Sequence, residues 1–82
     1  MKKRSQRLRI LDLFRKQGYT TIHQAQKLNI NNPYARIDEL RDLPDLTIDD
    51  IQVKRKGVKF KIYYTQKSRA LQYMREIGAE RT

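Results

Sequence analysis

The chain opens with apolar residues at helical spacing. Leu8, Leu11 and Phe14 recur every three residues, with further apolar positions between them. Such recurrence is typical of a helix that buries one face. Gly18 stops the pattern, as a glycine just past a helix end commonly does. We therefore predict a first helix over roughly residues 6–17.

Two shorter apolar stripes follow, each with three apolar residues at positions i, i+3 and i+6. The stripes are Ile22, Ala25 and Leu28, and then Tyr34, Ile37 and Leu40. Thr21 is placed to cap the first of these helices, and Pro33 suits the first turn of the second. The pattern predicts a helix of about seven residues and another over 33–42. Asn29 tolerates the left-handed backbone that a tight turn between them needs.

The period then changes to the alternation of strands, over residues 46–55 and 58–64. Lys56-Gly57 lies between the two runs as the tip of a β-hairpin. Pairing about that tip gives one apolar face, on which Val53 lies opposite Phe60 and Ile51 opposite Ile62. The other face sets Lys54 directly opposite Lys59. Like charges in that position destabilise a free hairpin, so the pair calls for an explanation.

A last apolar stripe predicts a C-terminal helix over residues 66–78. Leu71, Met74 and Ile77 form the stripe, and Gly78 ends it. The stripe either closes the core or forms a homodimer face, and we favour closing the core. The tail that follows, AERT, is expected to fray.

Length and composition limit what these elements can build. The chain has 82 residues and no cysteine, so we expect one domain over residues 1–82, without a disulfide or thiolate metal site. Its apolar runs are too short for a transmembrane helix or a signal peptide, which indicates a cytoplasmic protein without membrane association. Residues 1–5 are expected to form a flexible basic arm.

The net charge is +10, and it is unevenly distributed. Residues 1–18 carry seven basic side chains and one acid, and residues 51–75 carry eight basic side chains and no acid. Residues 31–50 carry six acids and two arginines. Because the positive charge is concentrated in two blocks, a polyanion is the expected partner.

The order of helices and hairpin predicts an α+β fold of the winged helix-turn-helix type, with three helices, a basic hairpin wing and a C-terminal helix. In that fold the third helix enters the major groove and the wing contacts the backbone or minor groove of DNA. Residues placed to read bases are Asn31, Asn32, Tyr34, Ala35 and Arg36. The basic residues of the wing are Lys54, Arg55, Lys56, Lys59 and Lys61. Further candidates for backbone contacts are Lys2, Lys3, Arg4, Lys67 and Arg69.

The acids of the third helix set a condition on this hypothesis. Asp38, Glu39 and Asp42 follow the proposed reading residues and would repel phosphates if they faced DNA. The major-groove model therefore requires the C-terminal half of the helix to point away, and it fails if these acids line the exposed face. Arg36 could contact DNA or form an ion pair, for which Asp38 or Asp42 is the expected partner.

The segments TTIHQAQKLNI and ARIDELR resemble the small helix-turn-helix proteins of phage and prophage genomes, which share an A-R-I-x-E-L-R segment, here Ala35 to Arg41. The resemblance covers roughly residues 8–64. It implies a winged helix-turn-helix fold and DNA binding by a phage-type regulator or accessory factor, without indicating an operator. Asn29 departs from the pattern, because a glycine usually occupies that turn.

Two alternatives to duplex DNA binding are a protein-binding module or inhibitor that docks a host protein through the acids of residues 38–50, and duplex RNA binding. The hairpin aromatics would also suit single-strand stacking, but Phe60 and Tyr64 face inward and only Tyr63 is left free, so core packing is favoured. We expect no enzymatic activity, metal or cofactor, because a lone histidine and scattered carboxylates form no recognisable site.

Overall fold

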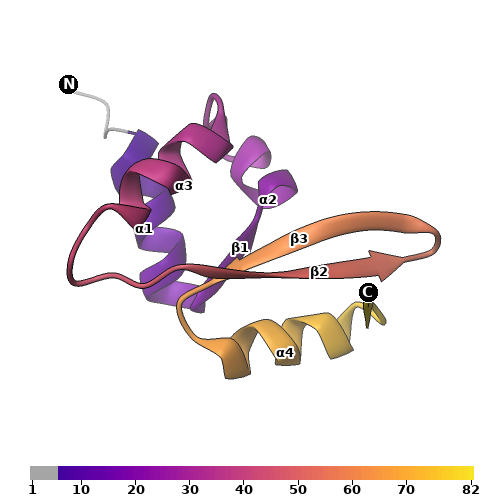
Figure 1. Ribbon diagram of the computed structural model, residues 1–82. Helices are drawn as coiled ribbons and strands as arrows, with labels where there is room; N and C mark the ends of the chain where they lie inside the picture. The colour runs from indigo at the N-terminus through magenta and orange to yellow at the C-terminus, as the bar shows by residue number, and fades with distance from the viewer. Residues whose placement is uncertain (1–5) are drawn as a thin grey trace.

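The computed structural model describes the backbone of residues 6–82 and the side chains of residues 8–82 (Figure 1). Four helices are present in this part of the chain: α1 (Gln6–Gln17), α2 (Ile22–Lys27), α3 (Pro33–Arg41) and α4 (Lys67–Glu76). Four strands accompany them: β1 (Tyr19–Thr21), β2 (Asp49–Arg55), β3 (Val58–Tyr64) and β4 (Glu80–Arg81). The predicted basic arm, with Lys2, Lys3 and Arg4, lies outside the described residues.

The strands form one antiparallel sheet in the order β1-β3-β2-β4. The predicted hairpin register is confirmed, because Val53 pairs with Phe60 and Lys54 pairs with Lys59. Residues 46–48 belong to the preceding loop rather than to the strand. The predicted α+β class is therefore confirmed, with two short strands added at the edges of the hairpin.

The expected fraying of the C-terminal tail is wrong. Ala79 is buried, and the two residues after it pair with β2. The backbone N–H of Thr82 donates to the carbonyl of Gln52 at 3.1 Å. The tail is held because the outer edge of β2 offers unpaired backbone groups, which a further strand satisfies.

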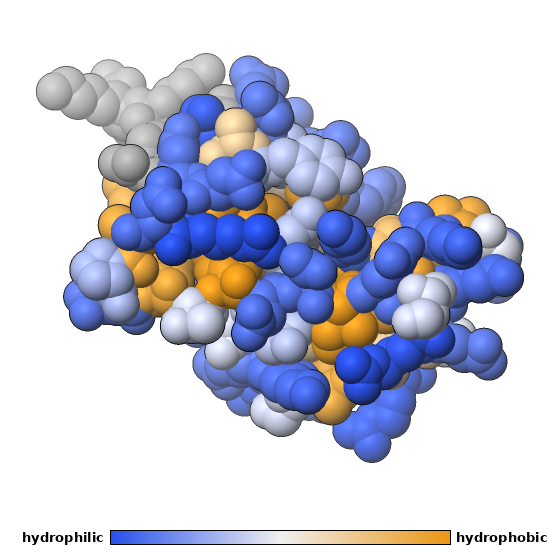
Figure 2. All heavy atoms as spheres, in the orientation of Figure 1, coloured by the Kyte–Doolittle hydropathy of each residue, from blue (hydrophilic) through white to orange (hydrophobic). Residues whose placement is uncertain are grey.

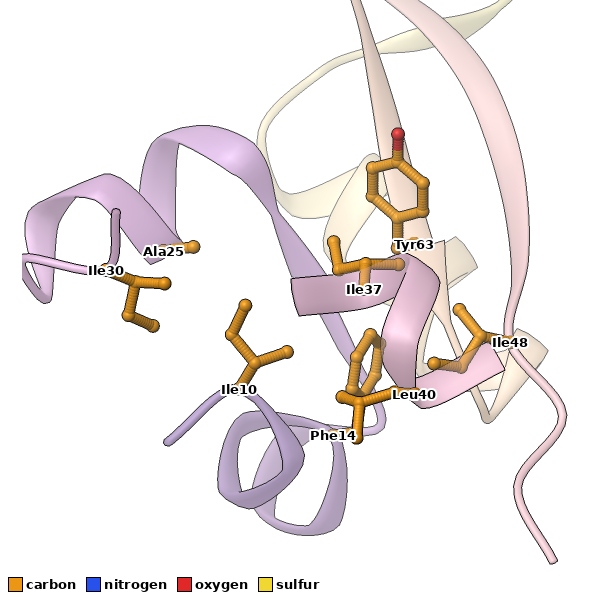
Figure 3. Close-up of a cluster of buried hydrophobic side chains, with 8 residues drawn as sticks. All are labelled: Ile10, Phe14, Ala25, Ile30, Ile37, Leu40, Ile48 and Tyr63. Atoms are coloured by element: carbon orange, nitrogen blue, oxygen red, sulfur yellow. The ribbon is translucent and has the colours of Figure 1, made fainter. Parts of the chain in front are cut away.

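One core lies between α1, α2, α3 and the base of the hairpin (Figure 3). Its buried side chains are Ile10, Phe14, Ala25, Ile30, Ile37, Leu40, Ile48 and Tyr63. The helical stripes predicted from spacing supply four of these eight, namely Phe14, Ala25, Ile37 and Leu40. Three other members of the stripes, Leu8, Leu28 and Tyr34, are exposed instead. At the start of α2, the hydroxyl of Thr21 accepts from the backbone N–H of Gln24 at 3.1 Å, so the predicted cap is confirmed.

A second core lies on the opposite face of the hairpin, beneath α4. Ile51, Val53 and Ile62 are buried there against Ala70 of α4. Leu71, Met74 and Ile77 also pack against this cluster, so α4 covers the sheet as we favoured. The sheet is thus enclosed by α4 on one face and, at its base only, by α1 to α3 on the other (Figure 1).

This two-sided cover corrects the expectation for Tyr63. Tyr63 points to the opposite face from Ile62 and is only 6% exposed, because α3 lies over that end of the sheet. It is therefore a core residue and is not free to stack on a base. No helix in the described part of the chain is long and apolar enough to cross a membrane.

Candidate nucleic-acid interface

Three lysines share one face of the outer half of the hairpin. Lys54, Lys59 and Lys61 are all exposed, and we call them the lysine face. Lys59 and Lys61 alternate with Phe60 and Ile62, so they share a face with Tyr63 further along β3. The base of that face is covered by α3, and the outer half carries the lysines. Figure 2 shows that hydrophilic side chains dominate this view of the molecule.

The remaining two basic residues of the wing have different surroundings. Lys56 and Gly57 form the turn with φ of 51° and 81°, the positive values of a type I′ turn, which suits a two-residue hairpin. Arg55 pairs with Val58 and points to the face opposite the lysines. The structure therefore brings three of the five predicted wing residues onto one surface.

The lysine face has an acidic neighbour that the sequence did not indicate. Lys54 lies across from Lys59 on one side and from Glu80 of β4 on the other. Directly opposed residues project to the same face of a sheet. Glu80 therefore supplies a negative charge beside the lysines. This neighbour could only be found once the tail was known to form a strand.

The predicted reading residues divide into an exposed group and a partly buried group. Asn31, Asn32 and Tyr34 are exposed at the start of α3, whereas Ala35 is partly buried. The guanidinium Nη2 of Arg36 lies 3.0 Å from Oε1 of Glu39, and the arginine side chain is 32% exposed. Arg36 therefore forms an ion pair, but its partner is Glu39 and not the expected Asp38 or Asp42.

The acids of α3 lie on its exposed face, which the major-groove model does not allow. Ile37 and Leu40 are buried, and Asp38, Glu39 and Asp42 are exposed along the outward side of the helix and at its end. Insertion of the whole helix would bring these carboxylates towards phosphates, which is unfavourable. By the condition set above, the predicted insertion of the third helix into the major groove is wrong, and only the N-terminal end of α3 remains suitable for contact with a duplex.

A network at the base of the hairpin ties α3 to the sheet. Nη2 of Arg41 donates to Oδ2 of Asp50 at 2.9 Å, and its guanidinium carbon lies 5.5 Å from the ring centre of Tyr63. The rings of Tyr34 and Tyr63 meet edge to face, with centres 6.5 Å apart. Burial raises the pKa of Tyr63, and the nearby Tyr34 and Asp50 add to this effect. Periodicity could not reveal this network, because it depends on how α3 crosses the strands.

The two remaining backbone candidates within the described chain are distant from the lysine face in the fold. Lys67 and Arg69 are exposed on α4, which covers the other side of the sheet. The side chain of Arg69 instead approaches Gly18, at the end of α1. No cluster of three or more potential metal-ligating side chains occurs among residues 6–82 that the structure describes.

Comparison of the chain with protein-family models, with curated proteins and with solved structures found no significant match. The resemblance to small phage proteins therefore remains a prediction from the quoted motifs.

Proposed function

We propose that this protein binds double-stranded DNA as a winged helix-turn-helix protein, with the lysine face on the phosphate backbone or in the minor groove. The observation that carries the proposal is the exposed surface formed by Lys54, Lys59 and Lys61. The order of elements supports the fold assignment: a strand between the first two helices joins the edge of the hairpin that follows α3.

The lysine pair has a physical explanation in this proposal. In the free protein, Lys54 opposite Lys59 is unfavourable by a few tenths of a kcal/mol, on the order expected for cross-strand pairs. Neighbouring phosphates would offset that repulsion, and each phosphate neutralised would release condensed counterions. Contacts of this kind position a protein on a duplex without reading its sequence.

The acids of α3 restrict how the duplex is approached. In the proposed complex, Asn31, Asn32 and Tyr34 lie at the groove edge and Asp42 lies away from the phosphates. Few base contacts are then available, and we expect a modest preference for sequence. A regulator or accessory factor that acts mainly through the backbone fits this arrangement.

A second candidate function is docking of a basic host protein. Its supporting observation is the acidic surface, made of exposed side chains on α3 and the following loop and strand. These residues are Asp38, Glu39, Asp42, Asp45, Asp49 and Asp50. Asp50 is paired with Arg41 and Glu39 with Arg36, which leaves Asp38, Asp42, Asp45 and Asp49 for a basic partner. The lysine face has no role in this alternative.

The test is a fluorescence-anisotropy titration against random-sequence duplex DNA at several salt concentrations, with duplex RNA in parallel. We expect log affinity to fall with log salt with a slope of about −3 or steeper, since each lysine of the lysine face would neutralise about one phosphate. Lys59→Ala and Lys61→Ala should each make the slope less steep by about 1.

Arg75→Ala is the matched control, because Arg75 is exposed on α4, on the other side of the sheet. It should leave both the affinity and the salt slope close to those of the wild type. A flat slope with weak binding would refute the proposal and favour the docking function. Equal or stronger binding to duplex RNA would assign the lysine face to RNA.

A further inference from the structure

One aromatic ring stands apart from the others on the surface. Tyr34 is 58% exposed, and it is the only aromatic among the exposed large apolar side chains of the part of the chain that the structure describes. The other rings are buried or partly buried in the two cores. A large open ring beside a basic surface resembles the platforms on which single-stranded nucleic acids stack their bases.

The Tyr34 ring is held from beneath. It meets the edge of Tyr63 at an interplanar angle of 82°, and Tyr63 is itself buried in the helical core. Arg41 lies over the Tyr63 ring and is anchored to Asp50. A ring supported in this way loses little side-chain freedom when a base stacks on it, because its position is largely set beforehand.

The platform adjoins the lysine face. Tyr63 shares its side of β3 with Lys61 and Lys59, so the lysines continue along the strand from the residue that supports Tyr34. Asn31 and Asn32 are exposed at the same end of α3. A strand whose phosphates lie on the lysines could therefore present a base to Tyr34. Bases inside a duplex are already stacked, so the base must be unpaired.

We propose that Tyr34 stacks on an unpaired base, and that the preferred substrate is a DNA duplex with a single-stranded extension. This inference rests on the proposed function, since the lysine face must hold the adjoining duplex. It also explains why an exposed aromatic ring and acidic α3 coexist: the helix end receives one base, and the rest of the helix stays out of the groove.

The test uses three DNA probes: a blunt duplex, the same duplex with one unpaired base, and a single strand. The unpaired base is 2-aminopurine, whose fluorescence is quenched when it stacks. We expect the wild type to bind the extended duplex about 5- to 150-fold more tightly than the blunt duplex, the range expected for stacking of one base. Binding should quench 2-aminopurine.

Tyr34→Leu should abolish the quenching and reduce affinity for the extended duplex to the value for the blunt duplex, so that the extended duplex loses far more affinity than the blunt one. Tyr34→Phe is the matched control and should retain the quenching and the preference, because it keeps the ring. An unchanged melting temperature for both variants would show that the fold is intact, as expected for so exposed a position.

Equal wild-type affinity for the blunt and extended duplexes would overturn the inference. An equal loss of affinity for the two duplexes in Tyr34→Leu would overturn it as well. In either case, the proposed function would still hold if the blunt duplex binds in a salt-dependent way and Lys59→Ala weakens that binding. Absence of that binding would refute the proposed function and the inference together. Tighter binding of the single strand than of the extended duplex would also overturn the preferred substrate.

Discussion

At the scale of single residues, left-handed backbone positions decide where the chain turns. Asn29 has a φ of 60° between α2 and α3, as its tolerance for that conformation predicted. At the hairpin tip, Lys56 and Gly57 both have positive φ. The two residues set the register of the hairpin, and the register decides which side chains form the lysine face.

Gly57→Ala should lower the free energy of unfolding by about 1 kcal/mol, because a residue with a Cβ is strained at positive φ. A Cβ at Gly57 would meet nothing within 4 Å, so the loss is a backbone effect and not a clash. Gly57→Asn is the control and should be less destabilised, since asparagine tolerates this conformation. Urea denaturation measures both, and equal stability of the alanine variant would contradict the turn assignment.

Residue identities also show what spacing could and could not predict. The pair of Arg36 with Glu39 is visible in the sequence as an i, i+3 spacing of opposite charges. The burial of Tyr63 was not predictable in the same way. Both faces of β3 are apolar near its end, and which face meets α3 is determined by the packing of three helices on the sheet.

At the scale of elements, the four helices and the hairpin followed from periodicity, whereas the two shortest strands did not. β1 has three residues and β4 has two, which is too short for alternation to be recognised. Each exists because an edge of the hairpin offers unpaired backbone groups to a neighbouring segment. The β4 strand matters for function because it brings Glu80 beside Lys54.

Glu80→Gln should raise the affinity for duplex DNA about two- to fivefold at low salt, since it removes a carboxylate next to the lysine face. The gain should shrink as salt is added, because salt screens charges at an exposed site. Glu76→Gln on α4 removes the same charge from the other side of the sheet and should change the affinity less. Anisotropy titrations compare the two, and equal effects would mean that only net charge matters.

At the scale of the whole molecule, folding turns blocks of charge along the sequence into separate surfaces. The basic block of residues 51–75 supplies the lysine face, and the acidic block of residues 31–50 supplies the exposed side of α3 and the loop after it. The blocks were evident beforehand, but their orientation was not. The acids are exposed because Ile37 and Leu40 are buried on the opposite side of α3.

This separation predicts how the molecule is oriented on DNA. If the outward side of α3 faces away from the duplex, Asp42→Asn should change the affinity by less than about twofold and leave the salt slope unaltered, because a distant exposed charge is largely screened. Lys59→Ala, measured in the same titration, should weaken binding and make the slope less steep. A marked gain in affinity for Asp42→Asn would instead mean that α3 lies along the phosphates.

If the acidic surface docks a basic protein, reversing the charges of Asp42 and Asp45 to lysine should abolish capture of that protein, and Lys59→Ala should not. The two sets of variants therefore assign the lysine face and the acidic surface to their partners independently.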